Sequence, residues 1–180
     1  MRLFELWNND PSKQYPTVPP GKSPIPLYHI SFNGQLQGVW TPQNPAGTEL
    51  ARPGAYPEPE LPRISVAPTL AQCFQAIYPN ISQFFEEQNL PALDFHVYRP
   101  MFKGHERVLT PAVLLRYDLV HDAHMTDEYC ILDPVFMAHV GQIRIQNTND
   151  LPFLSYHPFN NPDNPEKGFA PGHIKVKKLP

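Results

Sequence analysis

Several short stretches of the chain are rich in apolar, aromatic or β-branched residues, and each such stretch predicts a strand. Residues 27–32 are rich in aromatic and β-branched side chains, and the Asn33-Gly34 pair after them is typical of a tight turn whose residues tolerate positive φ. In residues 93–98 the apolar and polar side chains alternate strictly, which predicts a half-buried strand. Three further strands are expected at residues 63–67, 128–132 and 139–145. Residues 36–40 do not alternate clearly, so a strand there stays open.

One helix is predicted directly after the strand at residues 63–67. Thr69 and Gln72 have the spacing of a capping box, which satisfies the first backbone amides of a helix. Apolar residues then follow at helical spacing on one face: Leu70, Phe74, Ile77 and Ile81. Residues 108–120 are apolar but interrupted by Pro111, so strand and short helix both stay open there. Because strands and helices do not alternate along the chain, the expected fold class is α+β.

Proline divides the chain into three parts. The chain has 180 residues, of which 24 are prolines. Because proline fixes φ and has no backbone N–H, segments dense in proline do not lie inside a helix or a sheet. We therefore expect a proline-rich N-terminal segment over residues 1–26, a folded domain over residues 27–150, and a proline-rich C-terminal tail over residues 151–180 that is poorly ordered or wraps the surface. Within the domain, residues 42–62 predict a long irregular loop.

Charge and composition argue against several classes of protein. The net charge is −3 with the histidines neutral, which argues against electrostatic binding to long nucleic acids. No run approaches about 18 apolar residues, the length that spans a membrane. The first ten residues contain no apolar run of the kind found in secretory signals. We therefore expect a cytoplasmic protein without membrane contact, in which Cys73 and Cys130 are free thiols.

Candidate chemistry is sparse along the chain. His121 and His124 lie three residues apart, but two imidazoles fall short of a zinc ligand set, so no metal site is expected. The glycine-rich phosphate loops and the serine elbow of the α/β-hydrolases are absent from the sequence. His29, Ser65 and Glu128 remain as polar residues inside or at the start of predicted strands. Each taken alone has an ordinary structural explanation, and their order and setting make them candidates.

Three motifs together carry a resemblance to a known family. Residues 28–31 read Tyr-His-Ile-Ser at the end of a predicted strand, and residues 64–73 run from a strand straight into a helix. Glu128 opens a strand and is followed by a tyrosine, apolar residues and Asp133. In these features about residues 27–146 resemble the ADP-ribosyltransferase superfamily, whose poly(ADP-ribose) polymerase branch has a histidine, tyrosine and glutamate signature. The stretch is also similar to small bacterial and phage members of that superfamily.

The resemblance implies two short, bent β-sheets around an NAD cleft, with few helices and long proline-rich loops. It implies NAD as the substrate and an acceptor, macromolecular or small, that the sequence does not identify. His29 would hydrogen-bond a ribose, and Glu128 would bind a ribose hydroxyl and stabilise the positive charge that develops as nicotinamide leaves. The residues implied in catalysis are His29, Ser65 and Glu128. The residues implied in cofactor binding are Tyr28, His29, Ile30, Ser31, Phe32, Arg63, Ser65 and Tyr98.

Ser65 departs from the family, which commonly has at this point a tyrosine that stacks on nicotinamide. The stacking ring would then come from Phe32, Trp40 or Tyr98, and Arg63 would either face the diphosphate or be solvated. Because serine has no π face, the first alternative is an inactive module that binds NAD or an ADP-ribose-type nucleotide. The second alternative is an RNA 2′-phosphotransferase-like enzyme, although that family would need more basic residues around its cleft.

Overall fold

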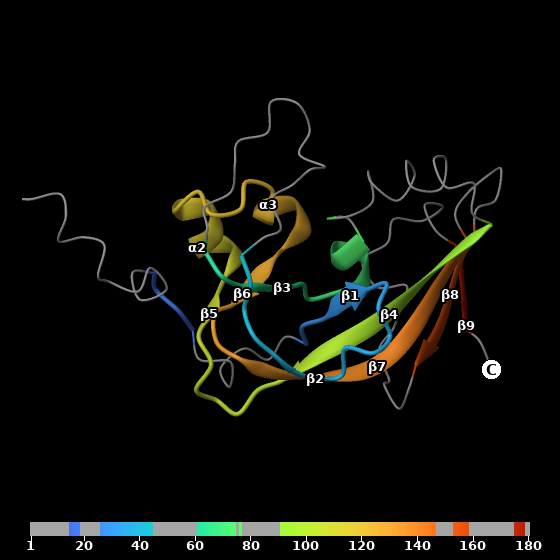
Figure 1. Cartoon of the computed structure of the whole chain (residues 1–180). Helices are drawn as coiled ribbons and strands as arrows, with labels where there is room; N and C mark the ends of the chain where they lie inside the picture. The colour runs from blue at the N-terminus through green and yellow to red at the C-terminus, as the bar shows by residue number, and fades with distance from the viewer. Residues whose placement is uncertain are drawn as a thin grey trace, which may run out of the picture.

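The fold is described by a computed structural model of the chain (Figure 1). The structure describes residues 15–18, 26–44, 61–74, 76 and 91–144, and the backbone of residues 145–146, 153–158 and 175–178. The expected helix residues Ile77 and Ile81 and most of the loop over residues 42–62 lie outside the described residues.

Two β-sheets make up most of the described fold. The larger sheet has the strand order β1–β4–β7–β8–β9, with β2 paired to β7. Its strands are β1 (His29–Ser31), β2 (Gly38–Trp40), β4 (Ala92–Met101), β7 (Val135–Gln146), β8 (Phe153–Pro158) and β9 (Lys175–Lys178). The smaller sheet has the order β3–β6–β5, with β3 (Ile64–Val66), β5 (Val108–Leu109) and β6 (Tyr129–Ile131). With the short helices α2 (Pro111–Arg116) and α3 (Ala123–Thr126), the fold class is α+β, as predicted.

The larger sheet is built around the long strand β7. β4 pairs with one edge of β7 along almost its whole length. The other edge is shared, because β2 pairs with residues 135–137 and β8 with residues 141–146. The register between β4 and β7 shifts between Val97 and Tyr98, where Val140 is an extra residue on β7. Such a bulge bends and twists the strands, and Figure 1 shows β4 and β7 running as a curved pair.

All five expected strands are present. The five predicted strands correspond to β1, β3, β4, β6 and β7, and the strand left open at residues 36–40 is β2. Residues 108–120 contain both alternatives, a strand (β5) and a helix (α2). Residues 153–158 and 175–178 form β8 and β9 where no strand was expected, because these segments are short and lie between prolines. β8 is antiparallel to β7 and β9 is parallel to β8, so the chain after residue 150 extends the larger sheet.

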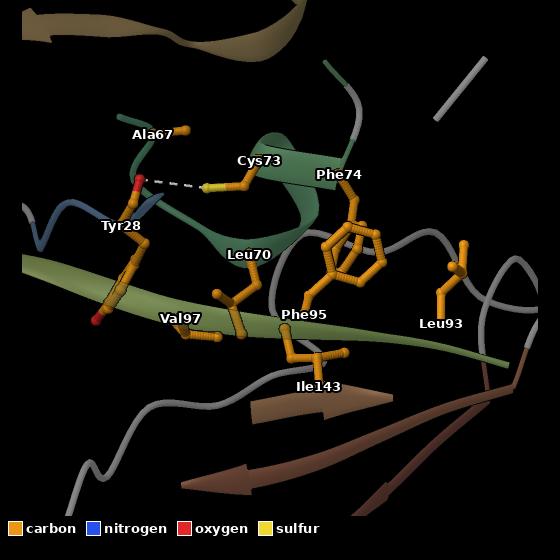
Figure 2. Packing of buried hydrophobic residues seen from close by; sticks show 9 residues of the cluster. All are labelled: Tyr28, Ala67, Leu70, Cys73, Phe74, Leu93, Phe95, Val97 and Ile143. Carbon is orange, nitrogen blue, oxygen red and sulfur yellow. Dashed lines mark hydrogen bonds between the residues drawn. The ribbon is translucent and has the colours of Figure 1, made fainter. Parts of the chain in front are cut away.

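The predicted capping box is also present. The hydroxyl of Thr69 accepts a hydrogen bond from the backbone N–H of Gln72 at 3.2 Å, and residues 70–74 are helical. This helix packs its apolar face on β4, as Figure 2 shows. The buried cluster that results contains Tyr28, Ala67, Leu70, Cys73, Phe74, Leu93, Phe95, Val97 and Ile143. The helix therefore holds the turn after β3 against the larger sheet.

Tyr98 departs from the alternation expected of its strand. It shares the polar face of residues 93–98, yet it is fully buried in a second cluster with side chains of both sheets. Its hydroxyl donates to the carbonyl of Asn33 at 2.7 Å and accepts from the backbone N–H of Leu36 at 3.2 Å. Because the polar tip has two backbone partners, the whole ring is buried at little cost.

Two other expectations concern the chain as a whole. Cys73 and Cys130 are free thiols, as predicted, and both are buried. The part of the chain that the structure describes contains no helix with the length and apolar character needed to cross a membrane.

Candidate functional site

The candidate site lies where the two sheets meet. Tyr28, just before β1, and Ala67, just after β3, exchange two backbone hydrogen bonds of 2.8 and 2.9 Å. These bonds join the larger sheet to the smaller one, and Figure 1 shows β1 next to β3. The junction sets His29 beside Ser65, and Nδ1 of His29 lies 2.8 Å from the carbonyl oxygen of Ser65.

Glu128 approaches the same junction from the other side of β3. β6 is antiparallel to β3, with Val66 opposite Tyr129, so continuing the register by one residue brings Glu128 beside Ala67. Oε1 of Glu128 lies 3.7 Å from the thiol of Cys130, which is fully buried in β6. β3 therefore lies between β1, which carries His29, and β6, which directly follows Glu128.

A small pocket brings the predicted catalytic residues together. Its volume is about 120 Å³, and its described lining includes His29, Ser65 and Glu128. The other described residues that line it are Tyr28, Ile30, Val66, Ala67, Gln72, Cys73, Ala76 and Thr126. Five of the residues implied by the sequence resemblance thus surround one space: Tyr28, His29, Ile30, Ser65 and Glu128.

A larger pocket of about 590 Å³ adjoins the small one, because His29 and Ser65 line both. Its other described lining residues are Leu36, Val39, Trp40, Thr41, Gln43, Asn44, Arg63 and Ile64. Arg63 is only 8% exposed, so its interpretation as a solvated arginine is wrong. It is held there because its backbone and that of Gln43 exchange hydrogen bonds of 2.9 and 3.3 Å, which draw the chain after β2 against β3.

Three of the implied cofactor-binding residues lie elsewhere. Ser31, Phe32 and Tyr98 are not among the described residues that line either pocket. The hydroxyl of Ser31 accepts from the backbone N–H of Asn33, and the exposed ring of Phe32 lies on Phe95 with 4.4 Å between the ring centroids. Tyr98 is buried beneath the turn it bonds. Of the three rings considered for stacking, the structure brings Trp40 to a pocket.

The environment of His29 favours a neutral imidazole. Burial lowers the pKa of His29 below 6.5, and the hydrogen bond with the carbonyl of Ser65 opposes this only in part. Since a carbonyl oxygen can only accept, Nδ1 carries the proton and Nε2 is left as an acceptor. The ring of Trp40 meets that of His29 edge-on, at 4.9 Å and 84°, and its indole N–H donates to the carbonyl of Leu36.

Sequence reasoning missed several lining residues. Gln72 was recognised as a helix cap but not as part of a pocket. Cys73 lines the small pocket, but burial raises the pKa of its thiol to about 12, so it is not a nucleophile. Its S–H donates to the carbonyl of Tyr28 at 3.3 Å (Figure 2). No pattern along the chain indicates that Gln72 and Cys73 line a pocket, because their positions there depend on the helix meeting β1 and β6.

Asp133, the last residue of the third motif, has a structural contact. Its carboxylate accepts hydrogen bonds from the backbone N–H of Arg107 at 2.6 Å and from the guanidinium at 2.7 Å. These bonds to Arg107 lower the pKa of Asp133. The pair ties the chain before β5 to the chain after β6, and thereby supports the sheet from which Glu128 projects.

The arrangement suits recognition of a polyol. The described residues contain no group of three or more His, Cys, Asp and Glu side chains able to hold a metal ion, and His121 bonds the exposed Asp118. Nε2 of His29 and the carboxylate of Glu128 can both accept hydrogen bonds from hydroxyl groups. A carboxylate also stabilises positive charge that develops beside it. No family model, curated protein or solved structure matches this chain.

Proposed function

We propose that this chain is an ADP-ribosyltransferase-like protein, which binds NAD between its two sheets and transfers ADP-ribose to an acceptor. The observation that carries the proposal is the small pocket lined by His29, Ser65 and Glu128. These residues come from three separate segments, and they are the residues that the sequence resemblance selects. The pocket lies at the junction of two sheets, as an NAD cleft of that family would.

The reaction uses the two acceptor groups in different ways. Nε2 of His29 accepts a hydrogen bond from a ribose hydroxyl and orients the sugar. Glu128 binds the hydroxyl on C2′ of the ribose next to nicotinamide. The bond between C1′ and the nicotinamide nitrogen breaks, and its electron pair leaves with nicotinamide. The Glu128 carboxylate stabilises the resulting cationic sugar, and it accepts the proton of the nucleophile that bonds to C1′.

The larger pocket would hold the rest of the dinucleotide. The buried guanidinium of Arg63 suits a diphosphate, because it offers several N–H donors in a fixed plane. Trp40 lines the same pocket and would supply the aromatic surface that Ser65 lacks. His29 and Ser65 line both spaces, so a ligand that reaches from one pocket to the other would pass between them.

A second candidate is a module that binds NAD or ADP-ribose without turning it over. Ser65 favours it, because the serine lines both pockets where the family has a ring that stacks on nicotinamide. Without that ring, the protein makes no stacking contact at this position with nicotinamide, either when NAD binds or when nicotinamide leaves. This candidate predicts saturable binding of NAD and no release of nicotinamide.

An assay that measures the release of nicotinamide from NAD by chromatography distinguishes the two candidates. The transferase requires turnover by the wild-type chain and its loss, by at least about a hundredfold, in Glu128→Gln, because the amide carries no charge to stabilise the cationic sugar. Asp122→Asn is the matched control, since this exposed carboxylate lines neither pocket. Equal activity of Glu128→Gln and the wild type would reject the catalytic assignment. If NAD and ADP-ribose neither bind nor raise the unfolding temperature, both candidates fail.

A further inference from the structure

Gln72 has a contact that an ordinary capping box does not make. In that motif the side chain three residues after the cap reaches back to the backbone N–H of the cap residue. Here Oε1 of Gln72 accepts from the hydroxyl of Thr69 at 2.8 Å, and Nε2 donates to Oδ2 of Asp127 at 3.1 Å. The Gln72 amide is therefore fixed at both ends. It bridges the helix that starts at residue 70 and the chain that leads into β6.

Asp127 occupies a backbone conformation that needs support. It ends α3 with φ 51° and ψ 37°, in the left-handed region that residues other than glycine rarely adopt. Aspartate tolerates this region better than most residues, and the hydrogen bond from Gln72 holds its side chain in place. The next residue is Glu128, so the direction in which the chain leaves Asp127 decides where the Glu128 carboxylate points.

We infer that Gln72 is a positioning residue for Glu128. Both side chains line the small pocket, although they come from different elements. The bond from Gln72 to Asp127 holds the residue before Glu128, and thereby aims the Glu128 carboxylate at the pocket. The inference rests on the proposed function, because it assigns Gln72 a part in the same reaction.

A change of charge tests the bridge while the helix cap is kept. In Gln72→Glu the new carboxylate still accepts from Thr69, so the capping box stays, but it repels Asp127. We expect kcat for nicotinamide release to fall about tenfold, as for the loss of a charge-assisted hydrogen bond, and Kd for NAD to change less than about twofold. In Asp127→Asn, the asparagine amide can donate to the carboxylate introduced by Gln72→Glu and restore the bridge. The same Gln72→Glu change should therefore cost less than about twofold in an Asp127→Asn background.

A structural measurement and a charge control accompany the kinetics. Hydrogen exchange at the backbone amides of Asp127 and Glu128, measured without NAD, should speed up in Gln72→Glu and slow again in the double variant. Gln35→Glu adds the same charge to an exposed turn residue that lines neither pocket, and it should reproduce neither effect.

The outcomes separate this inference from the proposed function. If the wild type releases nicotinamide and Gln72→Glu releases it equally fast, the inference is wrong and the proposed function stands. If Gln72→Glu loses the same factor in both backgrounds, the loss comes from the added charge and not from the bridge, and the inference is again wrong. If the wild type releases no nicotinamide, the proposed function fails and the role of Gln72 in it fails with it.

Discussion

The His29 imidazole carries a titration that can be measured without any ligand. Burial lowers its pKa below 6.5, so the folded state binds a proton less readily than the unfolded state. The stability that the neutral imidazole contributes is complete above pH 6.5 and is lost as pH falls through the lowered, folded-state pKa. We therefore expect the wild type to lose more stability than His29→Gln between about pH 7.5 and pH 5.

The comparison with His29→Gln is needed because the pKa of a second histidine, His139, is also lowered. Burial and the nearby His96 lower the pKa of His139, so its contribution has the same sign. Because His139 is present in both proteins, its contribution cancels in the difference between them. A difference in unfolding temperature that stays constant across this pH range would contradict the assignment of a buried, neutral His29.

His29, Ser65 and Glu128 could be selected from the sequence because their order along the chain and the strand motifs around them resemble a known family. Both the order of these residues and their motifs are contained in the amino-acid sequence itself. Arg63 and Gln72 could not be assigned in the same way. The burial of Arg63 depends on the chain after β2 pairing with residue 63, and the second bond of Gln72 depends on α3 ending beside the helix. Gln43, the partner of Arg63, and Asp127, the partner of Gln72, are both distant from these residues in the sequence.

At the scale of elements, one hydroxyl makes two hydrogen bonds to the turn between β1 and β2. Tyr98 bonds two backbone groups of this turn, and Leu36 at its end lines the larger pocket. Tyr98→Phe removes both of these part-buried bonds and leaves the carbonyl of Asn33 and the N–H of Leu36 without this partner. We expect the free energy of unfolding to fall by about 1–3 kcal/mol, measured by urea denaturation.

The matched control for this change is Tyr117→Phe. Tyr117 is 41% exposed at the end of α2, so loss of its hydroxyl should change the free energy of unfolding by less than about 0.5 kcal/mol. Equal effects of the two substitutions would mean that the hydroxyl of Tyr98 does not hold the turn.

The same turn shows how a correct prediction can have a different cause. The Asn33-Gly34 pair predicted a turn through its tolerance of positive φ, and a turn is present. Among the described residues, however, neither has positive φ. Glycine fits here because a Cβ at residue 34 would come within 2.5 Å of the ring of His96, and that ring would have to shift. A contact across the sheet, which the local pattern does not contain, explains this glycine.

At the scale of the molecule, the two sheets are joined near the candidate site and extended far from it. The backbone bonds between Tyr28 and Ala67 link the sheets at the pockets. At the opposite end of the strand order, β8 and β9 add two strands to the larger sheet. The expected boundary at residue 150 would separate these strands from the domain. Whether they belong to the same cooperative unit can be measured.

A chain that ends at residue 150 should be less stable than the full chain. Its β7 would lose the partner of residues 141–146, and their backbone groups would form an open edge. We expect the unfolding temperature to fall by several degrees, since each kcal/mol corresponds to about 2–4 °C in a chain of this size. We also expect self-association through the open edge, measured by light scattering. A chain that ends at residue 158 keeps β8 and should lie between the two. If the chain ending at residue 150 unfolds at the same temperature as the full chain and stays monomeric, β8 and β9 lie outside the cooperative unit and the domain ends where the sequence predicts.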